Sequence, residues 1–149
     1  MLSEERVETT LVAPDKASAL EAVAALLARG APELGAAAIA RVLRDREALA
    51  TTGVGDEVAI PHGKHPGLKG LVAALALAPS GVDFDSVDGR PVRIFVGILA
   101  PEKSAGDHVR ALARVARLLR NERTRARILE APTASTLLQV IRDEESVLG

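Results

Sequence analysis

A chain of 149 residues, with 48% hydrophobic and 26% charged residues, is long enough to bury a core and has the composition of a folded protein. A formal net charge of −1 argues against a general nucleic-acid binder, and two Phe without Tyr or Trp leave no platform on which bases could stack. The absence of cysteine excludes disulfides and thiolate metal sites and suits a reducing compartment.

The N-terminal stretch MLSEERVETT is polar and acidic, and it lacks the basic and then apolar form of a signal peptide. The longest apolar run, residues 71–78, is too short to cross a bilayer. No linker or repeat divides the chain. We therefore expect a cytoplasmic protein without membrane insertion, folded as one domain over residues 1–149.

The first part of the chain predicts one short strand followed by two helices. The strand is expected over residues 7–12. Asp15 has the chemistry of an N-cap, and apolar residues at helical spacing follow it until Gly30, which predicts the first helix. The second helix is predicted over residues 32–49, with Pro32 in its first turn.

Strands are predicted in the centre of the chain, over residues 58–60, 71–78 and 92–99. The last two are nearly continuous apolar runs, which is typical of central strands covered on both faces. Helices are expected from near residue 107, over residues 123–130 and over residues 135–144. This order predicts an α/β fold, a single-domain layered sandwich with a mixed β-sheet flanked by helices.

Arg46 is the first candidate functional residue. It lies three, four and seven residues after Leu43, Val42 and Ile39, so it falls on the apolar face of the second predicted helix. A buried guanidinium needs an anionic partner. The alternative is that its stem covers apolar surface while its head reaches solvent.

His62 is the second candidate, in the stretch AIPHG. Pro61 fixes the backbone before it, and Gly63 can adopt a positive φ and so expose the edge of the imidazole. A histidine at the end of a strand is well placed for a ligand, and near neutral pH much of it is an unprotonated nucleophile. A structural or surface histidine remains the alternative.

His108 is the third candidate, because it falls in the first turn of a predicted helix. Free N–H groups and the helix dipole favour an anion there, and a histidine can donate a hydrogen bond to a phosphate or carboxylate. The alternative is an exposed histidine at a helix start.

Two weaker patterns compete with these. His62 and His65 form an H-x-x-H pair that, with His108, suggests a zinc-dependent hydrolase, although Pro61 and Gly63 make a helix improbable there. The arginine-rich stretch over residues 110–127 predicts a solvated helix face rather than a nucleic-acid surface, since acidic residues interrupt it.

The run REALATTGVGDEVAIPHG, residues 46–63, resembles the active-site signature of the phosphotransferase-system enzyme IIA family of the fructose, mannitol and nitrogen-regulatory type. A second resemblance covers residues 81–119, GVDFDSVDGRPVRIFVGILAPEKSAGDHVRALARVARLL. Together these stretches extend the resemblance over most of the chain. The fold that it implies is a single α/β domain with a mixed sheet between helices.

The resemblance implies roles for three residues. His62 matches the histidine that is phosphorylated by HPr or its nitrogen-branch counterpart NPr, and His108 matches a second active-site histidine that hydrogen-bonds the phosphoryl group. Arg46, sixteen residues before His62, matches an arginine that neutralises the phosphoryl charge. His65 has no role in the motif, and the family needs no cofactor or metal.

The resemblance also implies partners. A phosphocarrier protein would supply the phosphoryl group, and a IIB domain or a regulated protein would receive it or respond to it. Because no IIB or IIC segment follows in this sequence, we expect a standalone nitrogen-regulatory IIA. The alternatives are a separate fructose- or mannitol-specific IIA subunit that passes phosphate to a IIB domain, and a binding module that is not phosphorylated.

Overall fold

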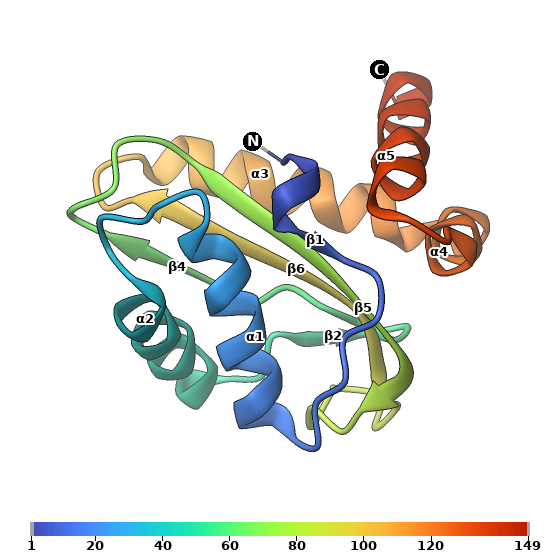
Figure 1. Cartoon of the computed structure of the whole chain (residues 1–149), viewed down its shortest axis with the longest axis horizontal. Helices are drawn as coiled ribbons and strands as arrows, with labels where there is room; N and C mark the ends of the chain where they lie inside the picture. Colours follow the sequence, from blue (N-terminus) through green and yellow to red (C-terminus); the bar gives the residue numbers. More distant parts are fainter. Residues whose placement is uncertain (1, 149) are drawn as a thin grey trace.

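The computed structural model describes residues 2–148, and most of its strands follow one another in the chain between two groups of helices (Figure 1). In chain order they are η1 (Glu4–Arg6), β1 (Val7–Glu8), α1 (Lys16–Ala28), α2 (Ala36–Leu49), β2 (Gly53–Gly55), β3 (Val58–Ala59), β4 (His62–His65), β5 (Val72–Val82), β6 (Val92–Pro101), α3 (Ala105–Arg120), α4 (Glu122–Glu130) and α5 (Ala134–Leu148).

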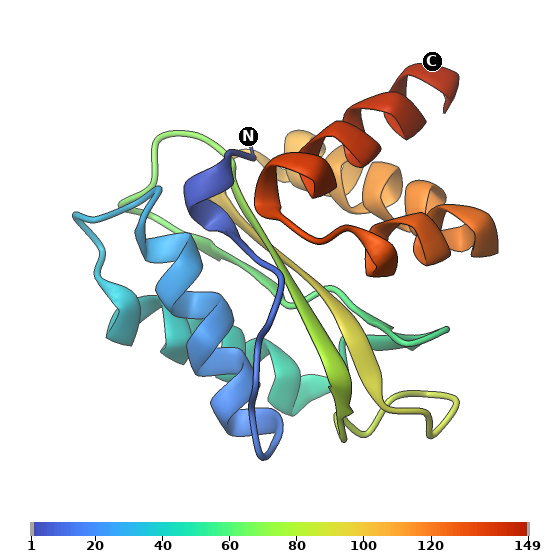
Figure 2. The ribbon, with the colours of Figure 1, turned by 45° about the vertical axis from the view of Figure 1, so that its right-hand side comes forward.

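A mixed sheet forms the middle layer. Its strand order is β1-β5-β6-β3-β2, and β4 pairs with β6 next to β3. The long strands β5 and β6 are antiparallel, whereas β1 pairs with β5, and β3 and β4 pair with β6, in parallel. Helices α1 and α2 cover one face and α3 to α5 the other, as Figure 2 shows. The predicted α/β sandwich with a mixed sheet is confirmed.

Side-chain alternation along β6 divides the apolar residues between two cores. Phe95 and Leu99 pack with α1 and α2, while Ile94 and Ile98 pack with the C-terminal helices. All four side chains are fully buried. A strand covered on both faces has few polar positions, which explains why the apolar run in this part of the sequence correctly predicted a central strand.

Element boundaries differ from prediction where local turns intervene. Asp15 is the N-cap of α1, and its carboxylate accepts a hydrogen bond from the Ser18 N–H at 2.8 Å, as predicted. Helix α2 begins at Ala36 instead of Pro32, because Pro32 lies in a turn closed by the Leu34 N–H and Gly35 has a φ of 80°. The first strand is also shorter than predicted and ends at Glu8.

Two strands were not predicted. Strand β2 contains two glycines, and β4 has the polar sequence HGKH, so neither shows an apolar pattern.

Within residues 2–148, no helix has both the length and the apolar character needed to span a bilayer.

Candidate active site

His62 is the first residue of β4, where the chain resumes its parallel pairing with β6. It lies opposite Ile98, whose backbone N–H donates a hydrogen bond to the Pro61 carbonyl at 3.0 Å. Ile60 and Ile98 belong to the core on the α3 side of the sheet. Because side chains alternate along a strand, His62 lies on that same side and faces α3.

Gly63 has a different role from the one predicted. The prediction of a positive φ is wrong, since the positive-φ glycines are Gly35, Gly55, Gly81 and Gly89. A Cβ on Gly63 would instead lie 2.3 Å from Cγ1 of Val42 on α2. A side chain at position 63 would therefore force β4 and α2 apart, which favours glycine after His62.

The imidazole of His62 is half-buried and hydrogen-bonded to its own strand. Its Nδ1 lies 2.7 Å from the carbonyl oxygen of Ile60. A carbonyl oxygen only accepts, so Nδ1 carries the proton in this contact and Nε2 keeps a lone pair. Burial lowers the pKa of His62, and the positive charge of Arg46 lowers it further. Near neutral pH the ring is therefore uncharged, with a lone pair on Nε2.

His108 lies in the first turn of α3, as predicted, but it is buried rather than exposed, with a relative accessibility of 7%. Its ring centroid is 5.3 Å from that of His62, and the ring planes are inclined by 49°. Burial lowers the pKa of His108, with smaller contributions from His62 and Lys64. Within residues 2–148 its buried Nδ1 has no hydrogen-bond partner.

Arg46 is half-buried near the C-terminal end of α2. Its Nη1 donates a hydrogen bond to the carbonyl of Ala50 at 2.8 Å, so this contact turns the guanidinium towards the end of its own helix. No carboxylate of residues 2–148 forms an ion pair with it. Its charge nevertheless acts on His62 by lowering the pKa of the ring. The structure thus brings His62 and His108 into contact and places Arg46 within electrostatic range.

Glu47 is a buried charged residue that was not among the predicted site residues. Its carboxylate accepts hydrogen bonds from the Thr52 N–H at 2.7 Å and from the Thr51 hydroxyl at 3.2 Å, and it lies 3.5 Å from Nζ of Lys16. Its negative charge raises the pKa of His62. A signal was present, because Glu47 follows Leu43 by one helical turn and shares its apolar face.

The zinc alternative loses its geometric basis. His62 and His65 are three residues apart in β4, so their side chains lie on opposite faces of the strand. Nδ1 of His65 accepts a hydrogen bond from the Gly67 N–H at 2.9 Å. Among residues 2–148, no three His, Cys, Asp or Glu side chains are arranged to hold a metal ion.

Three comparisons with known proteins agree with each other. The "Nitrogen regulatory protein" of Pseudomonas aeruginosa is 37% identical over 131 residues, which cover 88% of this chain and 85% of that protein. The "PTS system fructose-specific EIIA component" of Haloferax volcanii is 36% identical over 101 residues, which cover 68% of this chain and 66% of that protein. The crystal structure of Nitrogen Regulatory Protein IIA-Ntr from Neisseria meningitidis matches with a TM-score of 0.88 and 29% identity, over 93% of this chain and 94% of that one.

The family described as "Phosphoenolpyruvate-dependent sugar phosphotransferase system, EIIA 2" matches residues 1–144. The resemblance seen in the sequence and the mixed sheet between helices lead to the same result. The chain belongs to the EIIA 2 family of the phosphoenolpyruvate-dependent sugar phosphotransferase system, whose members are phosphotransfer components.

Proposed function

We propose that the chain is a histidine phosphocarrier that accepts a phosphoryl group on Nε2 of His62 from an HPr- or NPr-type phosphocarrier protein. The observation that carries this proposal is the 5.3 Å contact between the rings of His62 and His108. We further propose that residues 1–149 act as one EIIA domain in the cytoplasm. The family match over residues 1–144 supports this extent.

In the proposed step, the lone pair on Nε2 of His62 forms a bond to phosphorus while the N–P bond of the donor phosphohistidine breaks. The leaving nitrogen of the donor keeps the electron pair of that bond. The Nδ1 proton of His62 stays hydrogen-bonded to the Ile60 carbonyl, at 2.7 Å, which stabilises the positive charge that develops on the ring. The proton therefore needs no separate acceptor, and the chain supplies mainly positioning and charge.

His108 and Arg46 would stabilise the phosphorylated state. A phosphohistidine carries a large negative charge, comparable with the roughly −1.5 to −2 of other phosphorylated side chains. The buried Nδ1 of His108, which has no partner in residues 2–148, is a donor that a phosphoryl oxygen can satisfy. Arg46, which has no carboxylate partner in the same described part of the chain, supplies a compensating positive charge.

We propose a nitrogen-regulatory role for this phosphocarrier, in which the phosphorylation state controls binding to partner proteins. The 37% identity with a nitrogen regulatory protein and the TM-score of 0.88 with IIA-Ntr support this assignment. The second candidate is a sugar-specific IIA that passes the phosphoryl group to a IIB domain. It is favoured by the 36% identity with a fructose-specific EIIA component.

The test of phosphorylation uses phosphoenolpyruvate, enzyme I and an HPr-type protein from the organism that encodes this chain. The wild type should gain one acid-labile phosphate by intact-protein mass spectrometry. His62→Ala should gain none, whereas His65→Ala should be labelled like the wild type because His65 lies on the other face of β4. An unlabelled wild type with competent donors, or a fully labelled His62→Ala, would falsify the proposal.

Following the phosphate after it has been added to the protein distinguishes the nitrogen-regulatory role from the sugar-specific role. Purified phosphorylated protein is mixed with IIB domains of the fructose and mannitol type from the same organism. Loss of the label to one of them within seconds to minutes indicates sugar transfer. A stable label, together with a phosphorylation-dependent change in affinity for a regulatory partner, indicates the nitrogen-regulatory role.

A further inference from the structure

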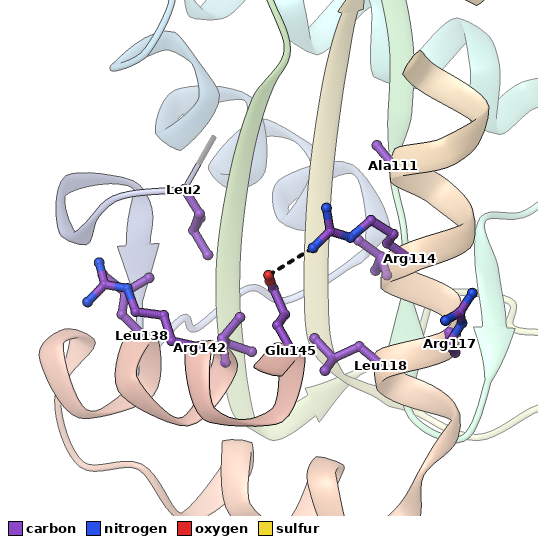
Figure 3. A pocket seen from close by; sticks show the side chains of 10 residues that line it. Leu2, Ala111, Arg114, Arg117, Leu118, Leu138, Arg142 and Glu145 are labelled. Atoms are coloured by element: carbon purple, nitrogen blue, oxygen red, sulfur yellow. Dashed lines mark hydrogen bonds and ion pairs between the residues drawn. The ribbon is translucent and has the colours of Figure 1, made fainter. Parts of the chain in front are cut away.

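A groove between α3 and α5 lies apart from His62, Arg46 and His108, none of which lines it. Figure 3 shows the side chains that line it. Its volume is about 610 Å³. Its apolar side chains are Leu2, Ala111, Val115, Leu118, Leu138 and Ile141. Three arginines and one glutamate complete the lining, and no step of phosphoryl transfer uses any of these residues.

The apolar side chains follow helical spacing on both walls. Ala111, Val115 and Leu118 stand at i, i+4 and i+7 on α3, while Leu138 and Ile141 stand at i and i+3 on α5. Two helices that present such rows form a surface onto which a third helix can pack, with its own i, i+3, i+4 and i+7 residues between them.

The charged residues of the groove carry an excess of positive charge. Arg114 forms an ion pair with Glu145 at 3.2 Å, but the two side chains are 71% and 45% exposed, so this pair is weak. Arg117 and Arg142 form no hydrogen bond or ion pair with any side chain of residues 2–148. Arg127 on α4, by contrast, is held by Glu144. Cations without partners thus remain beside the groove.

The arrangement of these arginines indicates the shape of the occupant. Figure 3 shows Arg117 on the α3 side and Arg142 on the α5 side of the groove. A ligand with a single anionic head group can pair with the arginine on only one side of the groove. A helix with an apolar stripe and carboxylates flanking it on both sides can satisfy both.

We propose that the α3–α5 groove binds an acidic amphipathic helix of a partner protein. Apolar side chains of that helix pack between α3 and α5, and its carboxylates pair with Arg117 and Arg142. Arg114 can exchange the carboxylate of Glu145 for one of the partner. This surface extends the function beyond phosphoryl transfer, because its occupancy does not require a phosphate on His62.

The test uses a fluorescein-labelled peptide of about 18 residues, long enough to form five helical turns, with Leu at i, i+3, i+4 and i+7 positions and Glu flanking them. Fluorescence anisotropy with the full chain should report saturable binding. Charge reversal in Arg117→Glu/Arg142→Glu should weaken it by about tenfold or more, because rim and groove charges then repel the peptide. Arg44→Glu, an exposed arginine on α2, is the matched control and should bind as the wild type does.

Two further variants and two further ligands show whether the peptide binds in this groove as a helix. His62→Ala should bind the peptide normally, so a failure of phosphoryl transfer does not affect the result. Arg142→Gln, a milder change, should weaken binding even if the double variant misfolds. Lack of peptide binding overturns the proposal. The proposal is also overturned if a scrambled Leu/Glu peptide binds as tightly as the designed one, or if the double variant binds the designed peptide as tightly as the wild type does. It is overturned as well if decanoate binds in the groove and the peptide does not.

Discussion

His62 and His108 lie with their ring centroids 5.3 Å apart although one opens an edge strand and the other begins a helix. Burial lowers the pKa of both rings, and the neighbouring His62 lowers that of His108 further. Two uncharged imidazoles therefore lie side by side near neutral pH. One has a free ring nitrogen and the other a buried nitrogen without a partner in residues 2–148, which suits a site that acquires an anionic group.

The first prediction concerns the pH dependence of stability. Because the folded-state pKa of both histidines lies below its ordinary value of about 6.5, the unfolded chain binds more protons below that pH. The free energy of unfolding should therefore fall as the pH falls from about 7.5 to about 5, and should change little above that window. Urea unfolding at three pH values measures it.

The control for this prediction is His62→Gln/His108→Gln, in which most of the dependence in this window should disappear. The pKa values of Asp15 and Asp88 are also lowered, by backbone hydrogen bonds, but these carboxyls titrate at lower pH and affect a lower window. A wild type whose stability stays constant or rises on acidification to pH 5 contradicts the expected neutral imidazoles.

The second prediction is that substitutions at the adjacent residues Arg46 and Glu47 shift the pKa of His62 in opposite directions. Arg46→Gln removes a positive charge that lowers the pKa of His62, so that pKa should rise. Glu47→Gln removes a negative charge that raises it, so the pKa should fall. NMR titration of the His62 ring protons measures both, with Arg44→Gln as a control of equal charge change. Shifts of the same sign in the two variants would show that the charges do not act on His62 as inferred.

The fold was largely predictable from local patterns. The strands near residues 72 and 92 are apolar on both faces, and Asp15 and the helical spacing after it marked α1 correctly. Strand β4 was not predictable in this way, because HGKH has no apolar alternation and becomes a strand only through pairing with β6. That pairing joins segments far apart in the sequence, which local propensity does not encode.

His62, His108 and Arg46, which the sequence singled out, lie near one another, and their roles stay predictions; the packing that places them was only partly predictable. The sequence predicted the first-turn position of His108, whereas its burial depends on how α3 packs over the sheet. The close approach of Val42 to Gly63 depends on the packing of α2 against β4 and has no local signature. Glu47 shares the apolar face of α2 with its neighbour Arg46, but its bonds to Thr52 depend on how the chain turns after α2. Helical spacing alone does not encode that turn.

The third prediction follows from the contact at Gly63. Gly63→Ala places a methyl group 2.3 Å from Cγ1 of Val42, so β4 and α2 must move apart, and we expect a loss of about 1–3 kcal/mol in the free energy of unfolding. Val42→Ala removes the clashing carbon and should restore part of that loss in the double variant. Urea unfolding of both single variants and the double variant gives the coupling energy.

Gly70→Ala is the matched control for this cycle. No atom lies within 4 Å of a Cβ at Gly70, and its φ is not in the left-handed region, so its stability should stay within about 0.5 kcal/mol of the wild type. Additive losses in Gly63→Ala and Val42→Ala would mean that the glycine is required for a reason other than its approach to α2.

The fourth prediction separates His108 from His62. His108→Gln removes the buried imidazole beside His62 but leaves the proposed nucleophile intact, so His62 should still be labelled. Loss of one hydrogen bond to a charged group, worth about 1.5–3 kcal/mol, should slow phosphoryl transfer by about 10- to 150-fold. Rapid-quench measurement of transfer from a phosphorylated HPr-type donor gives the rate. His65→Gln should transfer at the wild-type rate, since His65 faces the other side of β4. A His108→Gln variant that transfers as fast as the wild type would remove His108 from the mechanism and leave Arg46 as the remaining source of charge stabilisation.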